Sequence, residues 1–109
     1  MSDWTTVCSE HDITAGAGVC ALLGSDQVAI FKTRKENELY AVSNYDPFGK
    51  ANVLSRGIIG SIGDKVVVAS PLYKQHFDLA TGECIEDESV KLKTYAVRID
   101  SGKVQLGAA

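Results

Sequence analysis

Short apolar runs broken by glycine, aspartate and asparagine recur along the whole chain, and no segment shows the sustained periodicity of an amphipathic helix. Runs of this length with turn residues between them are typical of antiparallel strands. About ten of them fit into the chain, whose 109 residues have the length of one domain. The pattern therefore predicts an all-β fold, an antiparallel sandwich or barrel without linkers or internal repeats.

The apolar runs and the turn residues place the individual strands. We expect strands at Thr5–Cys8, Val19–Leu23, Gln27–Thr33, Leu39–Val42, Ile58–Gly60, Val66–Ala69, Phe77–Leu79, Glu83–Cys84, Tyr95–Ile99 and Lys103–Leu106. In the last hairpin Tyr95, Val97 and Ile99 alternate with more polar neighbours, so we expect them on one inward face. A short helical turn is expected at Ser89–Leu92.

The two prolines of the chain mark two loops between these strands. The first loop reads Asn44-Tyr45-Asp46-Pro47-Phe48-Gly49. The second reads Ser70-Pro71-Leu72-Tyr73-Lys74-Gln75-His76-Phe77-Asp78 and is followed by Thr81-Gly82-Glu83. Proline fixes φ and donates no backbone hydrogen bond, so each proline shapes a loop and does not build a strand. The two loops are the first candidates for a functional site.

Together the loops resemble the cluster-binding loops of Rieske iron–sulfur domains, which read Cys-Pro-His and Cys-Pro-Leu-His before a Phe-Asp and a Thr-Gly turn. The cysteine positions hold Asp46 and Ser70 here, and the histidine positions hold Phe48 and Tyr73. A Rieske [2Fe-2S] centre needs two thiolates on one iron and two imidazoles on the other. The resemblance implies a Rieske-like (ISP-type) β fold with a smaller cluster-binding-like subdomain at about 44–84, but without the ligands.

A wider set of positions is similar to the small subunit of assimilatory NAD(P)H-dependent nitrite reductases. The set comprises Asp46-Pro47-Phe48, Val53-Leu54-Ser55-Arg56-Gly57, Ala69-Ser70-Pro71-Leu72, Gln75 and Phe77. The resemblance covers about residues 4–106 of a single domain, 1–109. It implies an accessory subunit in the reduction of nitrite to ammonium, in nitrate and nitrite assimilation. FAD, sirohaem and an iron–sulfur cluster would belong to a separate large subunit, and this chain alone would have no catalytic activity.

The vacated cluster position can be closed by packing or used for another metal. The rings of Phe48 and Tyr73 would fill part of the void, which is favourable because cavities cost roughly 24 cal/mol per Å3. Asp46, Ser70 and Tyr73 carry oxygen atoms that a hard cation accepts, which leaves an electron-transfer protein with an atypical metal centre as an alternative. Phe48 offers no ligand atom, and a protonated serine hydroxyl is a poor ligand. We expect no catalytic residue and no metal in this chain.

A loop tip with aromatic and aliphatic side chains is typical of a docking surface. The candidates for contact with the large subunit are Tyr45, Pro47, Phe48, Lys50, Arg56, Leu72, Tyr73 and Lys74. In this interpretation the apolar side chains make the contact and the cations at its rim set the orientation. The competing interpretation turns the rings inward, to plug the vacated position. A stand-alone binding or regulatory module with the Rieske fold and another partner is the remaining alternative.

Composition bounds the other classes of partner. The formal net charge of −3 and the lack of a basic cluster argue against nucleic acid. The longest uncharged stretch, Ile13–Ser25, is too short and too rich in glycine to span a bilayer. The three cysteines form no Cys-x-x-Cys pair, and the N-terminal residues lack the basic start and apolar core of a signal peptide. We therefore expect a cytoplasmic protein without disulfides or membrane contact.

Three other features have a chemical interpretation beside a structural one. Cys8 and His11 have a spacing suited to zinc but lack a second ligand pair nearby, so we interpret the spacing as incidental. His76, beside the second loop, could donate a proton near a redox partner, although a surface or strand role is commoner. An acidic run is predicted to be a solvated face, with contact to a basic partner as the alternative; it comprises Glu83, Glu86, Asp87 and Glu88.

The missing ligands give a direct prediction about the purified protein. Because no thiolate or imidazole stands at the four ligand positions, we expect a colourless protein without visible absorption and without an EPR signal after reduction. Absorption spectroscopy, EPR and metal analysis check this. Stoichiometric iron and sulfide that survive chelation would contradict it.

Overall fold

The computed structural model of the chain describes residues 4–33, 38–72 and 74–108. Within these residues the chain forms eleven strands and two short 3-10 helices. The strands are β1 (Thr5–Ser9), β2 (Gly18–Leu23), β3 (Asp26–Lys32), β4 (Leu39–Ser43), β5 (Tyr45–Asp46), β6 (Ala51–Asn52), β7 (Ile58–Ile62), β8 (Lys65–Ala69), β9 (His76–Asp78), β10 (Thr94–Asp100) and β11 (Lys103–Ala108). The helices are η1 (Glu10–Asp12) and η2 (Leu54–Arg56). The prediction of an all-β fold is confirmed.

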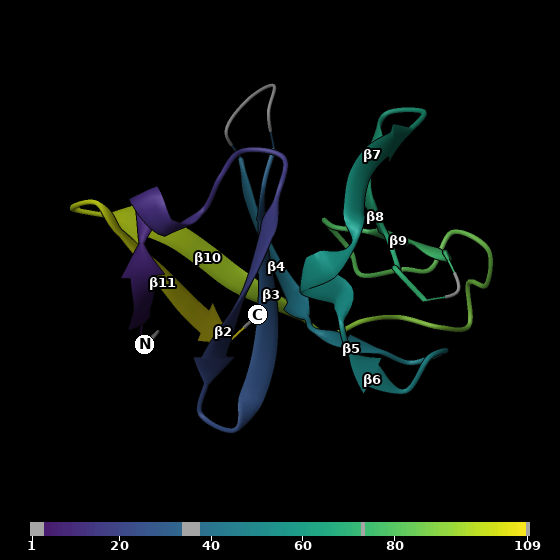
Figure 1. Cartoon of the computed structure of the whole chain (residues 1–109), viewed down its shortest axis with the longest axis horizontal. Coiled ribbons are helices and arrows are strands. Elements are labelled where there is room, and N and C mark those ends of the chain that lie inside the picture. The colour runs from purple at the N-terminus through teal and green to yellow at the C-terminus, as the bar shows by residue number, and fades with distance from the viewer. Residues whose placement is uncertain (1–3, 34–37, 73, 109) are drawn as a thin grey trace.

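Six strands form one antiparallel sheet in the order β1-β11-β10-β4-β3-β2. The sheet is strongly curved, and its two edge strands, β1 and β2, come close to each other, so that it nearly closes into a barrel (Figure 1). The hairpins predicted across the turns at residues 24–26 and 100–102 are the β2–β3 and β10–β11 pairs. No helix in the described part of the chain is long and apolar enough to cross a membrane.

Strand β3 shows how one apolar run serves two cores. Successive side chains of a strand point to opposite faces. Val28 and Ile30 pack into a cluster inside the six-stranded sheet, whereas Ala29 and Phe31 pack into a second cluster on its other face. All four are buried, which fits an uninterrupted apolar run better than an alternating one. Leu54 of η2 belongs to the second cluster and so ties the segment after the first loop to the sheet.

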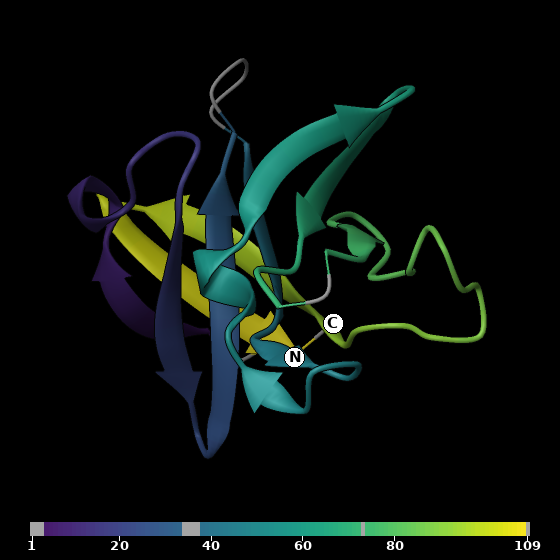
Figure 2. The same ribbon diagram turned by 45° about the vertical axis from the view of Figure 1, so that its right-hand side comes forward.

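The two loops of interest lie in the part of the chain that forms two smaller sheets. β5 pairs with β6, and β7, β8 and β9 form a three-stranded antiparallel sheet. Both lie to one side of the six-stranded sheet, and the β7–β8 hairpin projects away from the β5–β6 pair in both views (Figure 1 and Figure 2). The first loop bends between β5 and β6, and the second connects β8 to β9.

The helical turn expected at Ser89–Leu92 is wrong. The carbonyl of Val90 accepts a hydrogen bond from the N–H of Cys84 at 3.0 Å, and the N–H of Leu92 donates to the carbonyl of Gly82 at 2.7 Å. The segment therefore pairs with the preceding turn instead of coiling on itself. Backbone hydrogen bonds to the preceding turn have overridden a weak local helical preference.

Two further differences concern the sheets. Ile99 is 42% exposed and not part of an inward face. The cause is that β10 pairs with β4 only at Thr94 and Tyr95, so its far end has β11 as its one described strand neighbour. The short strands β5 and β6 were not predicted, because two-residue strands have no measurable periodicity.

Two glycines with positive φ give a matched test of how the turn after β9 is packed. Gly82 has φ +84°, and an added Cβ would overlap the carbonyl oxygen of Leu92; Gly63 has φ +63° with nothing within 4 Å. Left-handed strain of about 1–2 kcal/mol applies to alanine at either position. We expect Gly82→Ala to lower the free energy of unfolding well beyond Gly63→Ala, measured by urea denaturation. Equal losses would contradict the packing described for this turn.

Candidate functional site

The two loops meet at a buried hydrogen bond between the side chains of Asp46 and Ser70. Asp46 lies in β5 and Ser70 directly follows β8. The two residues are 0% and 1% exposed. The Ser70 hydroxyl donates to Oδ2 of Asp46. These are the two positions at which Rieske loops have cysteine, so a direct contact between protein atoms joins the positions that a metal ion joins there.

Both side chains also fix the loops from which they come. Oδ1 of Asp46 accepts hydrogen bonds from the N–H of Phe48 at 2.9 Å and of Gly49 at 3.2 Å. Oγ of Ser70 accepts one from the N–H of Leu72 at 3.2 Å. Aspartate and serine often make such local bonds at turns. Each side-chain oxygen at the junction therefore has a partner, and the buried carboxylate is satisfied.

The two loops repeat one backbone geometry that the sequence analysis did not detect. The N–H of Lys50 donates to the carbonyl of Asp46 at 2.7 Å, and the N–H of Lys74 donates to that of Ser70 at 3.1 Å. Both lysines are in the left-handed region, with φ of 55° and 63°. The available signal was Asp-Pro-x-x-Lys in one loop and Ser-Pro-x-x-Lys in the other. A pattern of five residues with one substitution is too short to stand out as a repeat.

The ring of Phe48 points towards the core. It packs against the second cluster, with its centroid 6.1 Å from that of Phe77 and the planes tilted by 45°. Leu72 lies over Gly49, where an added Cβ would overlap its Cδ1. For Phe48 the inward interpretation therefore describes the contacts better than docking. Tyr73, the other predicted ring, lies outside the described residues.

The donor set at these positions does not fit a [2Fe-2S] cluster. Asp46, Phe48 and Ser70 offer neither thiolate nor imidazole. The oxygens of Asp46 and Ser70 are bonded to each other and to backbone N–H groups. No group of three or more His, Cys, Asp or Glu gathers anywhere in residues 4–33, 38–72 and 74–108. An oxygen-ligated metal could use this pair only if the contact between the two loops opened.

Asn44, which the sequence analysis left without a role, anchors the first loop. It is 2% exposed and lies between β4 and β5. Its Oδ1 accepts from the N–H of Ser55 at 2.7 Å, and its Nδ2 donates to Oε1 of Gln27 at 3.2 Å. Its backbone N–H and carbonyl pair with Gln27 and Leu54. One asparagine thus connects the large sheet, the first loop and η2, but in the sequence it is only a polar residue after a strand.

His76 forms a close pair with one carboxylate of the acidic run. Its ring nitrogen Nδ1 lies 2.6 Å from Oε2 of Glu86. The backbone N–H of His76 donates to Oε1 of the same carboxylate at 2.7 Å. Partial desolvation acts to raise the pKa of Glu86, but the hydrogen bonds from His76 outweigh it and hold that pKa below its ordinary value. Burial raises the pKa of the nearby Cys84 thiol. The run is exposed, yet Glu86 fastens the end of the second loop.

Cys8 and His11 show no sign of a zinc site. Cys8 lies in β1 and His11 in η1, where His11 is exposed. Burial, followed by the charge of Asp12, raises the pKa of the Cys8 thiol. A raised thiol pKa disfavours the thiolate that zinc requires. The described residues provide no third ligand beside this pair.

Tyr95 and its neighbours form a structural cluster at the edge of the barrel. The hydroxyl of Tyr95 donates to Oδ2 of Asp26 at 3.0 Å, and Nζ of Lys93 lies 3.5 Å from the same oxygen. Burial, followed by the contact with Asp26, raises the pKa of Tyr95 to about 12. This phenol therefore stays protonated at neutral pH and holds the β2–β3 turn against β10.

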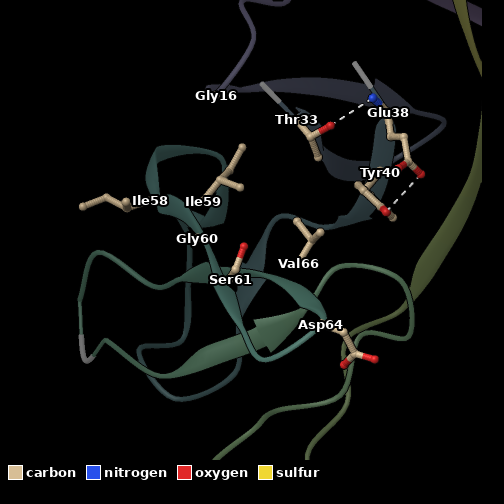
Figure 3. A pocket seen from close by; sticks show the side chains of 10 residues that line it. All are labelled: Gly16, Thr33, Glu38, Tyr40, Ile58, Ile59, Gly60, Ser61, Asp64 and Val66. Atoms are coloured by element: carbon tan, nitrogen blue, oxygen red, sulfur yellow. Dashed lines mark hydrogen bonds between the residues drawn. The ribbon is translucent and has the colours of Figure 1, made fainter. Parts of the chain in front are cut away.

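A groove beside the three-stranded sheet is lined by residues other than the two loops. It has a volume of about 560 Å3 and runs between the β7–β8 hairpin and the facing ends of β3 and β4 (Figure 3). Glu38 and Tyr40 line one side, and Ile58–Ser61 with Asp64 line the other. Within the described part of the chain, none of the candidates from the sequence analysis lines it. The groove therefore does not extend the site formed by the loops.

The joined loops form an exposed end of the molecule, which we call the tip. It comprises Tyr45–Lys50, Arg56, Pro71, Leu72 and Lys74. Tyr45 is 43% and Leu72 47% exposed, and both are apolar or aromatic. Its three cations, Lys50, Arg56 and Lys74, are exposed, whereas Pro47 and Phe48 are half-buried. The tip thus exposes two apolar or aromatic side chains and three positive charges.

Comparison with known proteins identifies the family. The model of the family described as Rieske-like [2Fe-2S] domain matches residues 3–107. Over 106 residues the chain is 49% identical to the nitrite reductase (NADH) small subunit of Salmonella typhimurium, covering 97% of this chain and 98% of that protein. The chain belongs to the Rieske-like family of nitrite reductase small subunits. The family and the fold predicted from the loops are therefore confirmed.

Two further relatives bear on the fold and on the partner of this nitrite reductase small-subunit homologue. The solution structure of the Escherichia coli protein NirD is 47% identical and superposes with a TM-score of 0.91, covering all of this chain and 99% of that one. A nitrite reductase (NAD(P)H) large subunit of Klebsiella oxytoca is 38% identical over 104 residues. That match covers 95% of this chain but only 11% of the Klebsiella protein.

The junction between the loops gives a stability prediction. Ser70→Ala removes the hydroxyl donor from a fully buried carboxylate, and a hydrogen bond to a charged group contributes about 1.5–3 kcal/mol. We expect a loss of that size in the free energy of unfolding, measured by urea denaturation. Ser25→Ala, at an exposed turn serine, is the control and should change stability by less than about 0.5 kcal/mol. Equal effects of the two substitutions would contradict a structural role for the junction.

Proposed function

We propose that this chain is the accessory small subunit of a cytoplasmic NADH- or NADPH-dependent nitrite reductase that reduces nitrite to ammonium in nitrate and nitrite assimilation. It docks on a large subunit that carries FAD, sirohaem and an iron–sulfur cluster. It holds no cluster of its own and transfers no electrons. Its contribution is to stabilise the large subunit or to gate access to a site on it.

One observation carries the proposal of a large-subunit partner. Nearly all of this chain has a counterpart within a Klebsiella oxytoca protein that is itself a nitrite reductase large subunit. A domain that is part of one polypeptide is held at a high effective concentration beside its other domains. The same domain as a separate chain needs a surface that replaces the covalent link. This supports a specific interface over a stand-alone module.

The tip is the surface that best fits this role. Tyr45 and Leu72 expose apolar area, and Leu72 is held in place because it packs over Gly49. A side chain that is already ordered loses little entropy when it becomes an interface anchor. Phe48 contributes from inside, by fixing the first loop against Phe77. The proposed anchors are therefore Tyr45 and Leu72, with Pro47 beside them.

The activity test compares the large subunit with and without this chain. We expect nitrite-dependent oxidation of NADH by the purified large subunit to rise, or its lifetime at working temperature to lengthen, when this chain is added. The chain alone should show no such activity. An unchanged rate and lifetime, together with no binding between the two proteins, would refute the proposed function.

The docking surface is tested by a matched pair of substitutions. Leu72→Asp introduces a charge into the proposed contact, whereas Ile99→Asp does so at an isoleucine near the end of β10 that is 42% exposed and is not part of the tip. We expect only Leu72→Asp to weaken binding to the large subunit, by about tenfold or more because it buries a charge at an apolar contact. Binding can be measured by titration. A folded Leu72→Asp variant with unchanged affinity would rule out the tip as the docking surface.

A further inference from the structure

Three residues other than glycine have positive φ in the described part of the chain. They are Lys50 (φ 55°), Lys74 (φ 63°) and Ser101 (φ 52°). Ser101 lies in the tight turn between β10 and β11. The two lysines occupy the same step of the two loops, four residues after Asp46 and Ser70, where each N–H donates back to the carbonyl of that anchor.

Nothing in the fold calls for lysine at this step. A left-handed residue that ends such a turn is usually glycine, because a Cβ there is strained. Apart from Ser101, the other positive φ values in the described residues belong to glycines, among them Gly63 and Gly82. The side chains of Lys50 and Lys74 are exposed and form no ion pair or hydrogen bond with the residues that the structure describes. Backbone strain that is not offset by a stabilising contact of the strained residue is a mark of functional sites.

The charge of the tip differs from that of the whole chain. The protein has a formal net charge of −3. Within residues 44–57 and 70–75 the charged residues other than Asp46 are the cations Lys50, Arg56 and Lys74, all exposed. Asp46 is fully buried and bonded to Ser70. Loop segments that expose positive but no negative side chains on an acidic protein are expected to orient it against a negatively charged surface.

We propose that Lys50 and Lys74 are a charge-recognition pair that binds carboxylates on the large subunit. This inference rests on the proposed function and specifies the partner surface as acidic. The junction between Asp46 and Ser70 fixes the start of both loops, and the shared hydrogen-bond pattern fixes the step at which each lysine leaves its loop. The left-handed backbone thus sets the direction of both Cα–Cβ bonds. Three cations are too few to follow a phosphate backbone, so a protein surface fits better than nucleic acid.

The test separates charge recognition from folding. The double variant Lys50→Gly/Lys74→Gly relieves left-handed strain, so its urea midpoint should stay the same or rise. Its dissociation constant for the large subunit at low salt should rise by about tenfold or more, and the difference should shrink at high salt. Ser101→Gly is the control: it relieves the same strain in the β10–β11 turn and should leave binding unchanged.

A second double variant tests whether the charge of the two lysines is what the partner recognises. Lys50→Arg/Lys74→Arg keeps both cations and should bind nearly as well as the wild type. The inference is overturned if the double glycine variant binds with wild-type affinity at low salt, or if the arginine pair loses as much affinity as the glycine pair. Normal binding by the double glycine variant refutes this inference alone. Absence of binding by the wild-type chain refutes the proposed function, and this inference with it.

Discussion

The hydrogen bond between Ser70 and Asp46 is the contact on which the candidate site depends. It is buried, and it joins the two loops directly, beside the contact of Leu72 in the second loop with Gly49 in the first. In a cluster-bearing Rieske domain the metal centre crosses between the same loops and holds them by four ligand bonds. Here the contact between the side chains of Asp46 and Ser70, at the two cysteine positions, holds the loops together. Hydrogen bonds from backbone N–H groups of each loop to these side chains support it. The fold therefore keeps two loops in register by ordinary hydrogen bonding.

The packing around this junction explains why a single contact can be enough. Phe48 lies against Phe77, and Leu72 lies over Gly49, so each loop also carries an apolar side chain that fixes it. Asn44 fastens the first loop to the large sheet, and Glu86 fastens the end of the second through His76. Each of these hydrogen bonds contributes only about 1 kcal/mol net to the free energy of unfolding. Together they restrict the loops so that the junction forms at little further entropic cost.

The regular part of the fold was predictable because its signals are local. The apolar run of β3 and the glycine turns of the β2–β3 and β10–β11 hairpins fix strands and connections directly. The irregular part of the fold was not predictable in this way. The segment after Gly82 forms backbone hydrogen bonds with the turn that precedes it, and β5 and β6 are strands of only two residues. Such elements exist because of tertiary contacts, and a single sequence does not show which backbone groups will meet.

The site was found from the sequence in outline but not in its chemistry. The resemblance picked out Asp46 and Ser70 as replaced ligands, yet it gave no reason to expect that they bond to each other. It also treated the tip lysines as a rim, whereas their strain and equivalent positions became visible only in the backbone. A replaced ligand set can mean that a loop has lost its purpose. Under the proposal that Lys50 and Lys74 recognise the large subunit, the shared backbone pattern, the buried junction and a strained cation at the same step of both loops belong to a surface that is still in use.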